Sequence, residues 1–248
     1  MLDHGILGVV DRQVRTWSVR DAEVYAAAVG GFSPAFAIPL LQHGGPHLGL
    51  TGADMTRVLH AEQSLWLHRR LRPELPSTVT KTVENIYDKG SGALVVSRWE
   101  SEFATTRSSC FVKGEGGFGG ERGETREFTV PGEPPEAGFF RTARNQALLY
   151  RETGDVNPMH TDPEFARRAG FPGPILHGLC TLGITVRGLD FTELHARFTA
   201  PVLPGDLLRV ERWPTGEFRA LVDGKQVLIG TVRFSEAGRS PEVRTIVP

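Results

Sequence analysis

The sequence has little of what marks secreted, membrane-spanning or nucleic-acid-binding proteins. It holds only two cysteines, Cys110 and Cys180, in 248 residues, which argues against a disulfide framework. No apolar run reaches the roughly 18 residues that a membrane-spanning helix needs. The 28 Lys and Arg residues are balanced by 29 Asp and Glu, so the net charge is −1 and there is no basic excess to neutralise phosphates. We therefore expect no nucleic-acid partner and no membrane association.

The two ends of the chain carry no targeting signal that we can identify. The N-terminus has no basic region before an apolar stretch, so it does not resemble a secretory signal peptide. The C-terminal Thr245-Ile-Val-Pro248 is not a peroxisomal address. The sequence therefore predicts a cytoplasmic protein.

The composition changes sharply once, between Lys113 and Gly138, where Gly, Glu, Arg and Pro replace large apolar residues. Such a segment cannot bury enough apolar surface to offset the entropy of ordering it. We predict a linker over residues 116–138, between an N-terminal unit of residues 1–115 and a C-terminal unit of residues 139–248. Within this linker, residues 128–130 could still form a short strand.

The two halves also share a faint sequence repeat. Pro73-Glu-Leu-Pro-Ser-Thr-Val-Thr-Lys81 matches Pro201-Val-Leu-Pro-Gly-Asp-Leu-Leu-Arg209, 128 residues later. After a one-residue gap, Ala93-Leu-Val95 matches Ala220-Leu-Val222. Both copies are typical of a Pro/Gly turn that leads into a hairpin. The match favours a duplicated fold.

Each half is predicted to form helices first and then strands joined by short turns. The predicted helices cover Val19–Val29, Thr142–Glu152, Asp162–Gly170 and Leu179–Leu189. The predicted strands are Thr78–Tyr87, Ala93–Phe103, Ala196–Thr199, Leu207–Trp213, Phe218–Val222 and Val227–Phe234. This order predicts an α+β fold with an antiparallel sheet, because a doubly wound parallel sheet would alternate strands with helices.

The densest cluster of reactive side chains lies in Asp155-Val-Asn-Pro-Met-His160. Pro158 prevents a continuous helix, and a turn at Asn157-Pro158 can bring Asp155 and His160 together. An Asp beside a His can act as a general acid/base pair. A loop in which Asp155 and Asn157 only cap backbone amides is an alternative. A metal site formed by Asp155, His160 and Asp162 is a further one.

A second candidate site is His177-Gly178, at the predicted start of the buried helix. A helix N-terminus offers unpaired N–H groups, and glycine allows a ligand to approach the backbone closely. This arrangement predicts a site for an oxyanion or a carbonyl oxygen. Gly178 could instead serve only close packing. We reject Cys180 as a nucleophile because its surroundings are apolar.

Residues 150–181 resemble the hydratase-2 motif of the MaoC-like (R)-specific enoyl-CoA hydratases. The matching features, in order, are Gly154-Asp-x-Asn-Pro-x-His160, Asp162-Pro-x-Phe-Ala166, Ala169-Gly-Phe171 and Pro174-Ile-Leu-His-Gly-Leu-Cys-Thr181. In the first half, Leu59-His-Ala-Glu-Gln63 and Asp88-Lys-Gly90 resemble segments of the two-repeat members. Ala61 stands where those members usually have glycine.

The resemblance implies a double hot dog fold, in which each of two repeats is a long helix wrapped by an antiparallel sheet. The first half has no acid/base motif, because Tyr25-Ala-Ala-Ala-Val-Gly30 is the nearest counterpart of Tyr150–Asp155. The resemblance therefore implies one catalytic repeat and one degenerate repeat that holds the acyl chain. It also implies a homodimer and no metal or redox cofactor.

The implied reaction is reversible addition of water to a trans-2-enoyl-CoA, which gives a (3R)-3-hydroxyacyl-CoA. By resemblance, Asp155 and His160 activate the water, Asn157 orients the loop or the substrate, and the Gly178 N–H stabilises the carbonyl oxygen. The implied substrate contacts are His60, Ala61, Lys89, Val156, Pro158, Met159 and Phe198. Lys89 could instead be a solvated turn residue, and Phe198 a plain core residue.

Two other functions remain open from the sequence. The same residues would serve a dehydratase that works in the opposite direction on a fatty-acid synthesis intermediate. A non-catalytic acyl-CoA-binding protein is the second alternative, although the complete set of Asp155, Asn157 and His160 argues against it.

Overall fold

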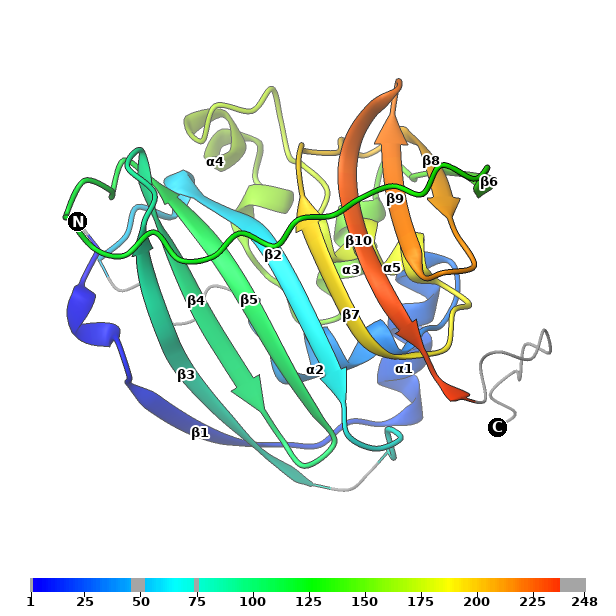
Figure 1. The fold of residues 1–248 in the computed structure, drawn as a ribbon, viewed down its shortest axis with the longest axis horizontal. Coiled ribbons are helices and arrows are strands. Elements are labelled where there is room, and N and C mark those ends of the chain that lie inside the picture. The colour runs from blue at the N-terminus through cyan, green and yellow to red at the C-terminus, as the bar shows by residue number, and fades with distance from the viewer. Residues whose placement is uncertain (1, 46–51, 74–75, 237–248) are drawn as a thin grey trace.

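The computed structural model describes residues 2–45, 52–73 and 76–236, so the C-terminal segment of residues 245–248 lies outside the described residues. One antiparallel sheet carries the fold, and the helices lie on one of its faces (Figure 1). Its strands follow the order β1-β3-β4-β5-β2-β7-β10-β9-β8-β6. Their bounds are β1 Val10–Arg15, β2 Val58–Leu67, β3 Ser77–Asp88, β4 Gly92–Glu100, β5 Ala104–Lys113, β6 Glu136–Arg141, β7 Phe191–Phe198, β8 Leu207–Arg212, β9 Glu217–Val222 and β10 Lys225–Phe234.

The two halves of the sheet are related by an internal symmetry of strand order. The N-terminal half runs β1-β3-β4-β5-β2, and the C-terminal half continues in the mirrored order β7-β10-β9-β8-β6. β2 and β7 join the halves as an antiparallel pair, with Glu62 opposite Arg197 and Ser64 opposite His195. This arrangement is the double hot dog that the family resemblance implies.

The sequence repeat falls at equivalent places in the two halves. The first copy runs into the β3–β4 hairpin and the second into the β8–β9 hairpin, as predicted. Ala93 lies in β4 and Ala220 in β9, and both are fully buried. Residues 74–75 of the first copy lie outside the described residues.

Short helices cover the inner face of the sheet and supply the core. They are η1 His4–Ile6, α1 Val19–Val29, η2 Pro34–Phe36, α2 Ala37–Leu41, η3 Met55–Arg57, α3 Gln146–Arg151, η4 Pro158–His160, α4 Pro163–Arg168 and α5 Gly178–Val186. α1 has the bounds that the sequence predicts, whereas α3 starts four residues later than predicted and α5 ends three residues earlier. Tyr25 of α1 and Tyr150 of α3 are both buried and contact each other edge to face, with ring centroids 6.5 Å apart.

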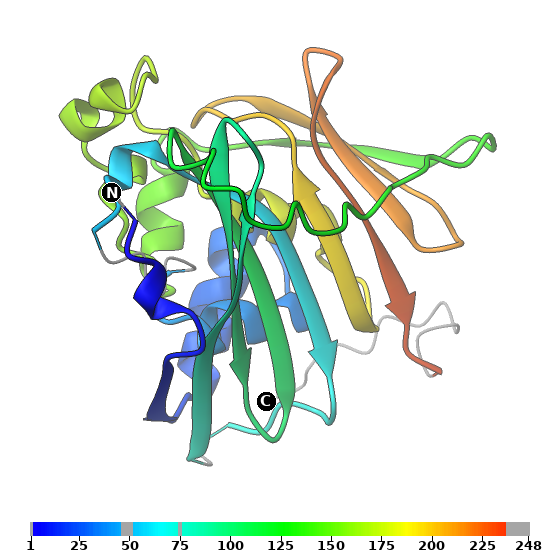
Figure 2. The same ribbon diagram turned by 60° about the vertical axis from the view of Figure 1, so that its left-hand side comes forward.

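The segment between the halves crosses the outer face of the sheet, away from the helices (Figures 1 and 2). It contains no helix or strand from Glu115 to Pro135, so the short strand considered for residues 128–130 does not form. Because this segment runs across the strands, its backbone cannot join their ladder. β6 begins at Glu136, inside the predicted linker. The exact boundaries of the two units stay a prediction.

Side chains of both halves hold this crossing segment in place. The Asp88 carboxylate accepts hydrogen bonds from the N–H groups of Gly90, Gly117 and Gly119, which lower its pKa to about 2. Farther along, the Trp213 indole donates to the Glu133 carbonyl at 2.8 Å. The crossing segment is therefore tied to the sheet at both ends.

Within the described residues, no single helix is both long and apolar enough to cross a membrane. The helices Val19–Val29 and Pro34–Leu41 have the required length and composition only when taken together, and they are bent by 112°.

Candidate active site

The acid/base motif lies in the loop that follows α3, and local backbone chemistry gives the loop its shape. Gly154 has a φ of +105°, a conformation that side-chain-bearing residues rarely adopt. Asn157 caps η4, because its side chain accepts a hydrogen bond from the Met159 N–H at 3.1 Å. The Asn157 N–H in turn donates to Asp155 Oδ1 at 3.3 Å. Asp155 and Asn157 therefore do cap backbone amides, as the alternative interpretation proposed. The same hydrogen bonds hold Asp155 and His160 on one side of the loop.

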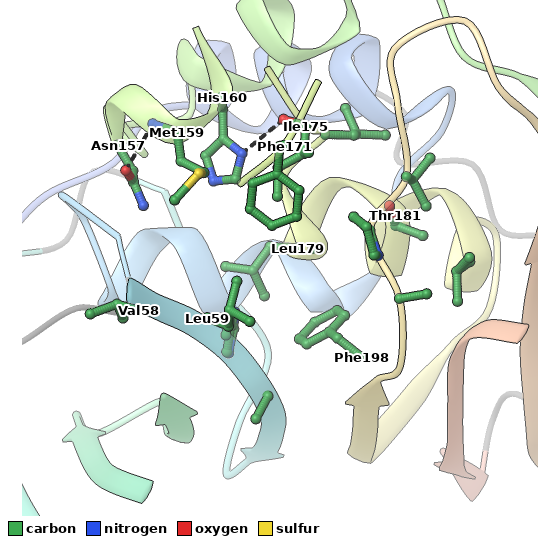
Figure 3. Close-up of a pocket in the computed structure, with 18 of the residues that line it drawn as sticks. Val58, Leu59, Asn157, Met159, His160, Phe171, Ile175, Leu179, Thr181 and Phe198 are labelled. Carbon is green, nitrogen blue, oxygen red and sulfur yellow. Dashed lines mark hydrogen bonds between the residues drawn. The ribbon is translucent and has the colours of Figure 1, made fainter. Parts of the chain in front are cut away.

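A hydrogen bond to the backbone determines the tautomer of His160. Its Nδ1 lies 2.9 Å from the Ile175 carbonyl oxygen, and a carbonyl can only accept, so Nδ1 carries the proton (Figure 3). In the neutral ring, Nε2 is then the acceptor. Burial lowers the pKa of His160, while the nearby Asp155 carboxylate opposes that shift. His160 is therefore prepared to accept a proton through Nε2 at neutral pH.

A second histidine completes the cluster. His177 is 1% exposed, and its Nε2 lies 3.2 Å from the Asp155 carbonyl oxygen. Its ring stacks on that of His160, with centroids 3.7 Å apart and an angle of 30° between the planes. Side-chain atoms of Asp155, His160 and His177 all lie within 4.8 Å of one another. From the sequence, His177 is expected beside Gly178 at the helix start and near Cys180, and not beside Asp155 and His160.

Gly178 is the first residue of α5, with His177 as its N-cap. Its N–H is one of the first-turn donors that an α-helix leaves without an intrahelical acceptor. A Cβ on Gly178 would lie 3.1 Å from ring carbons of Phe198, so the packing alternative is also correct. Phe198 contacts the His60 ring as well, at 4.7 Å between centroids. Glycine thus brings the helix N-terminus close to Phe198 at the pocket wall.

These groups open into one pocket with a volume of about 280 Å³ (Figure 3). Its wall is mainly apolar and comes from both halves of the chain. The described lining residues are Val58, Leu59, His60, Ala61, Phe111, Asp155, Asn157, Met159, His160, Phe171, Ile175, Leu176, Gly178, Leu179, Thr181, Phe198, Thr199, Ala200, Pro201, Val202 and Val227. Histidine, carboxylate, amide and threonine side chains supply the polar part of this lining, and aromatic and aliphatic side chains supply most of the rest.

The structure brings together most of the residues that the sequence predicts for the site. Asp155, Asn157, His160 and Gly178 line the pocket, as do the predicted contacts His60, Ala61, Met159 and Phe198. The other three predicted contacts, Lys89, Val156 and Pro158, are not among the described lining residues.

The three residues outside the pocket have identifiable surroundings. Lys89 lies in the β3–β4 turn, with its Nζ 5.8 Å from the centre of the Tyr87 ring. Val156 lies in the same loop as Asp155 and is 54% exposed. Pro158 is also exposed and forms the first residue of η4.

Ala61, which replaces the glycine usual in the family, lies in a β-bulge. The pairing of β2 with β5 shifts register between His60 and Glu62, so Ala61 is the extra residue. Asp223 is the single non-glycine residue with positive φ in the part of the chain that the structure describes. Ala61 therefore has an ordinary backbone conformation, and alanine causes no strain there.

The metal site considered from the sequence does not form in the way proposed. The Asp162 carboxylate caps α4 instead, accepting from the N–H groups of Glu164 and Phe165. Asp155, His160 and His177 are close enough to hold an ion. Of the two imidazole rings, His160 directs Nδ1 to the Ile175 carbonyl and His177 directs Nε2 to the Asp155 carbonyl.

Known proteins are similar to this chain in both sequence and fold. Residues 127–236 match the family model described as "MaoC like domain". 3-Hydroxyacyl-thioester dehydratase Y of Mycobacterium tuberculosis is 35% identical over 260 residues, which cover 88% of this chain and 89% of that protein. The chain belongs to the MaoC-like family. This MaoC-like protein is accordingly an enzyme of the hydro-lyase class.

Other similarities agree with this assignment. Enoyl-CoA hydratase ChsH3 of Mycobacterium tuberculosis is 37% identical over 180 residues, which cover 66% of the MaoC-like chain and 63% of ChsH3. The crystal structure of a MaoC-like dehydratase from Phytophthora capsici matches with a TM-score of 0.82 at 28% identity, covering 93% of this chain and 97% of that one. A Mycobacterium tuberculosis protein described as having a double hotdog fold matches with a TM-score of 0.60 at 14% identity, covering 91% and 95% of the two chains, which supports the fold alone.

Proposed function

We propose that this protein catalyses the reversible, (R)-specific hydration of a trans-2-enoyl-CoA to a (3R)-3-hydroxyacyl-CoA. The observation that carries the proposal is the meeting of three groups in one pocket: the Nε2 of His160, the Asp155 carboxylate and the first-turn N–H of Gly178. Each group fits one requirement of the reaction.

The first requirement is polarisation of the thioester. The β-carbon of an enoyl thioester is electrophilic only when its carbonyl oxygen accepts negative charge. In this proposal the Gly178 N–H, at the positive end of α5, donates to that oxygen. Loss of one such donor typically costs about 3 kcal/mol in the transition state.

The second requirement is an activated water. His160 Nε2 accepts a proton from the water while the Asp155 carboxylate holds it, and the water oxygen forms a bond to C3. The electrons of the C2=C3 double bond move toward the carbonyl as an enolate. The proton then passes to C2, so one water molecule is consumed and the catalytic groups return to their starting state.

The third requirement is a dry pocket for the acyl chain. Phe111, Phe171 and Leu59 provide apolar surface in the same pocket as the acid/base pair. Similar proteins are named enoyl-CoA hydratase and 3-hydroxyacyl-thioester dehydratase, which are the two directions of one reaction. These names support a thioester substrate, and the same residues would serve either direction.

The test follows the absorbance of the enoyl thioester after protein is added to crotonyl-CoA and to trans-2-decenoyl-CoA, with chiral analysis of the product. We expect rapid loss of absorbance, a (3R) product, and turnover abolished by Asp155→Asn. Asp162→Asn is the matched control, because that carboxylate only caps α4, and it should keep full activity. No turnover with either thioester would refute the proposal, and so would an active Asp155→Asn variant.

The proposed reaction uses only side chains and backbone groups of this chain. We therefore propose that no metal or redox cofactor takes part. Dialysis against EDTA, followed by the same absorbance measurement, should leave the rate unchanged. A rate that falls and returns on adding zinc would show that a metal does take part.

A further inference from the structure

His177 is almost completely enclosed, and its ring lies between the acid/base loop and the core. Its ring lies against His160 at 3.7 Å and against Tyr150 at 5.0 Å between centroids. Tyr150 in turn contacts Tyr25 from the N-terminal half, at 6.5 Å. A continuous column of four aromatic rings thus runs from the pocket to the core between the two halves.

The stack with His160 has a geometric consequence. The hydrogen bond from Nδ1 to the Ile175 carbonyl anchors one edge of the His160 ring, but a single bond still allows the ring to rock about it. A second ring, stacked 3.7 Å away at an angle of 30°, restricts that motion. The two contacts together define the direction in which Nε2 of His160 points.

The bond to Asp155 has a second consequence. The Asp155 carbonyl oxygen can only accept, so Nε2 of His177 is the donor across 3.2 Å. His177 is also the N-cap of α5 and directly precedes Gly178. One side chain therefore links the loop that carries Asp155 to the helix end that carries the Gly178 N–H.

From these contacts we infer that His177 is a positioning residue, which holds the His160 ring and the Asp155 loop in register with the N-terminus of α5. This inference rests on the proposed function, because it assigns His177 to the geometry of that reaction. His177 touches no reacting atom in this role, so its effect should appear in kcat and not in substrate binding.

Two substitutions separate the two contacts. His177→Phe keeps a flat ring against His160 but removes the donor to Asp155. His177→Gln keeps a donor near the position of Nε2 but removes the ring. The destabilisation control is Ile184→Val, because Ile184 is fully buried on the same helix and is not among the described residues that line the pocket.

We expect each His177 variant to lower kcat by about 10- to 100-fold, the effect of misplacing catalytic groups by about 1 Å, with KM within about threefold of the wild type. Ile184→Val should lower Tm and leave kcat unchanged. Wild-type kcat in both His177 variants would overturn the inference. The inference would also be overturned if the decrease in kcat were proportional to the decrease in Tm across the two His177 variants and Ile184→Val.

A spectroscopic measurement keeps this inference distinguishable from the proposed function. The ring current of His177 should displace the Cε1–H resonance of His160, which His160→Ala identifies by its loss. We expect His177→Gln to move that resonance and His177→Phe to keep it displaced. An unchanged resonance in His177→Gln would refute the stack, whereas a displaced resonance in an inactive wild type would refute the proposed function alone.

Discussion

Gly45 lies directly against the carboxylate of Asp155, although the two residues come from different halves of the chain. A Cβ built on Gly45 would lie 2.9 Å from Asp155 Oδ1, and Gly45 has a φ of +95°. Beside it, the Gly44 N–H donates to the Gly154 carbonyl oxygen at 3.0 Å. The N-terminal half has no acid/base motif of its own, but it packs against the Asp155 carboxylate of the C-terminal half and restricts its position.

Substitution of Gly45 by alanine should therefore impair catalysis as well as stability. The new Cβ would push the Asp155 carboxylate from its place, and we expect kcat to fall by at least about tenfold. The left-handed backbone adds about 1–2 kcal/mol of strain. Steady-state kinetics and thermal unfolding measure the two effects separately.

Gly44→Ala provides the matched control for that prediction. Gly44 has a φ of +91°, but a Cβ there would have no atom within 4 Å. It should lose similar stability and keep its kcat. Equal kcat values for the two variants would show that the contact with Asp155 has no catalytic role.

On the acid side of the pH–activity profile, kcat/KM should begin to fall at a lower pH than it would with a histidine of ordinary pKa as the base. Burial lowers the pKa of His160 from 6.5, and the base must be neutral to accept a proton, so kcat/KM should stay constant down to below pH 6.5. The Asp155 carboxylate favours the charged ring, so Asp155→Asn should lower this pKa further. NMR titration of the His160 ring in both proteins tests the sign. A pKa that rises in Asp155→Asn would contradict it.

Alanine at Gly178 should slow the reaction for a steric reason. The N–H remains, but the new Cβ would lie 3.1 Å from the Phe198 ring and force one of them to move. We expect a kcat reduced by about tenfold or more. Shortening the neighbour in Gly178→Ala/Phe198→Leu should restore part of that loss, which a double-mutant cycle measures. Additive losses would mean that Phe198 is not the cause.

The acid/base loop and the helix start could be predicted from the sequence, because neighbouring residues in the chain determine both. Pro158 and Asn157 dictate the turn that brings Asp155 and His160 to the same side, and the helix start at Gly178 follows from the apolar stretch after it. Gly45 and His177 could not be assigned in this way. Their roles depend on contacts across the two halves and on ring stacking, and neither contact has a sequence pattern.

The fold was predictable in its class and in its duplicated hairpins, but four strands and α2 were missed. β5 shows why: Thr106 and Ser108 are fully buried in it, so its burial does not follow an apolar alternation. These hydroxyls have tertiary partners, since Gln42 donates to Thr106 at 3.0 Å and Ser108 lies 2.9 Å from His60. A polar strand that is satisfied by distant side chains resembles a loop when the sequence is read alone.

Arg197 should hold the crossing segment on the outer face of the sheet without affecting catalysis. Its guanidinium pairs with Glu62 at 2.8 Å, donates to the Arg126 carbonyl, and lies 5.4 Å from the Phe128 ring. We expect Arg197→Ala to lose about 1 kcal/mol of stability, because one partly exposed ion pair and one cation–π contact disappear. Trypsin should then cleave faster at Arg126, since local opening of the segment becomes easier.

The control for this prediction is Arg209→Ala, which removes the ion pair between the exposed Arg209 and the buried Glu211 on β8. Because Arg219 still pairs with Glu211, we expect a loss of stability of at most about 1 kcal/mol, with the cleavage rate at Arg126 unaltered. Both variants should keep the wild-type kcat, because Arg197 and Arg209 are not among the described residues of the pocket. If Arg197→Ala is cleaved no faster than Arg209→Ala, the segment is held instead by its two ends, at Asp88 and at Trp213.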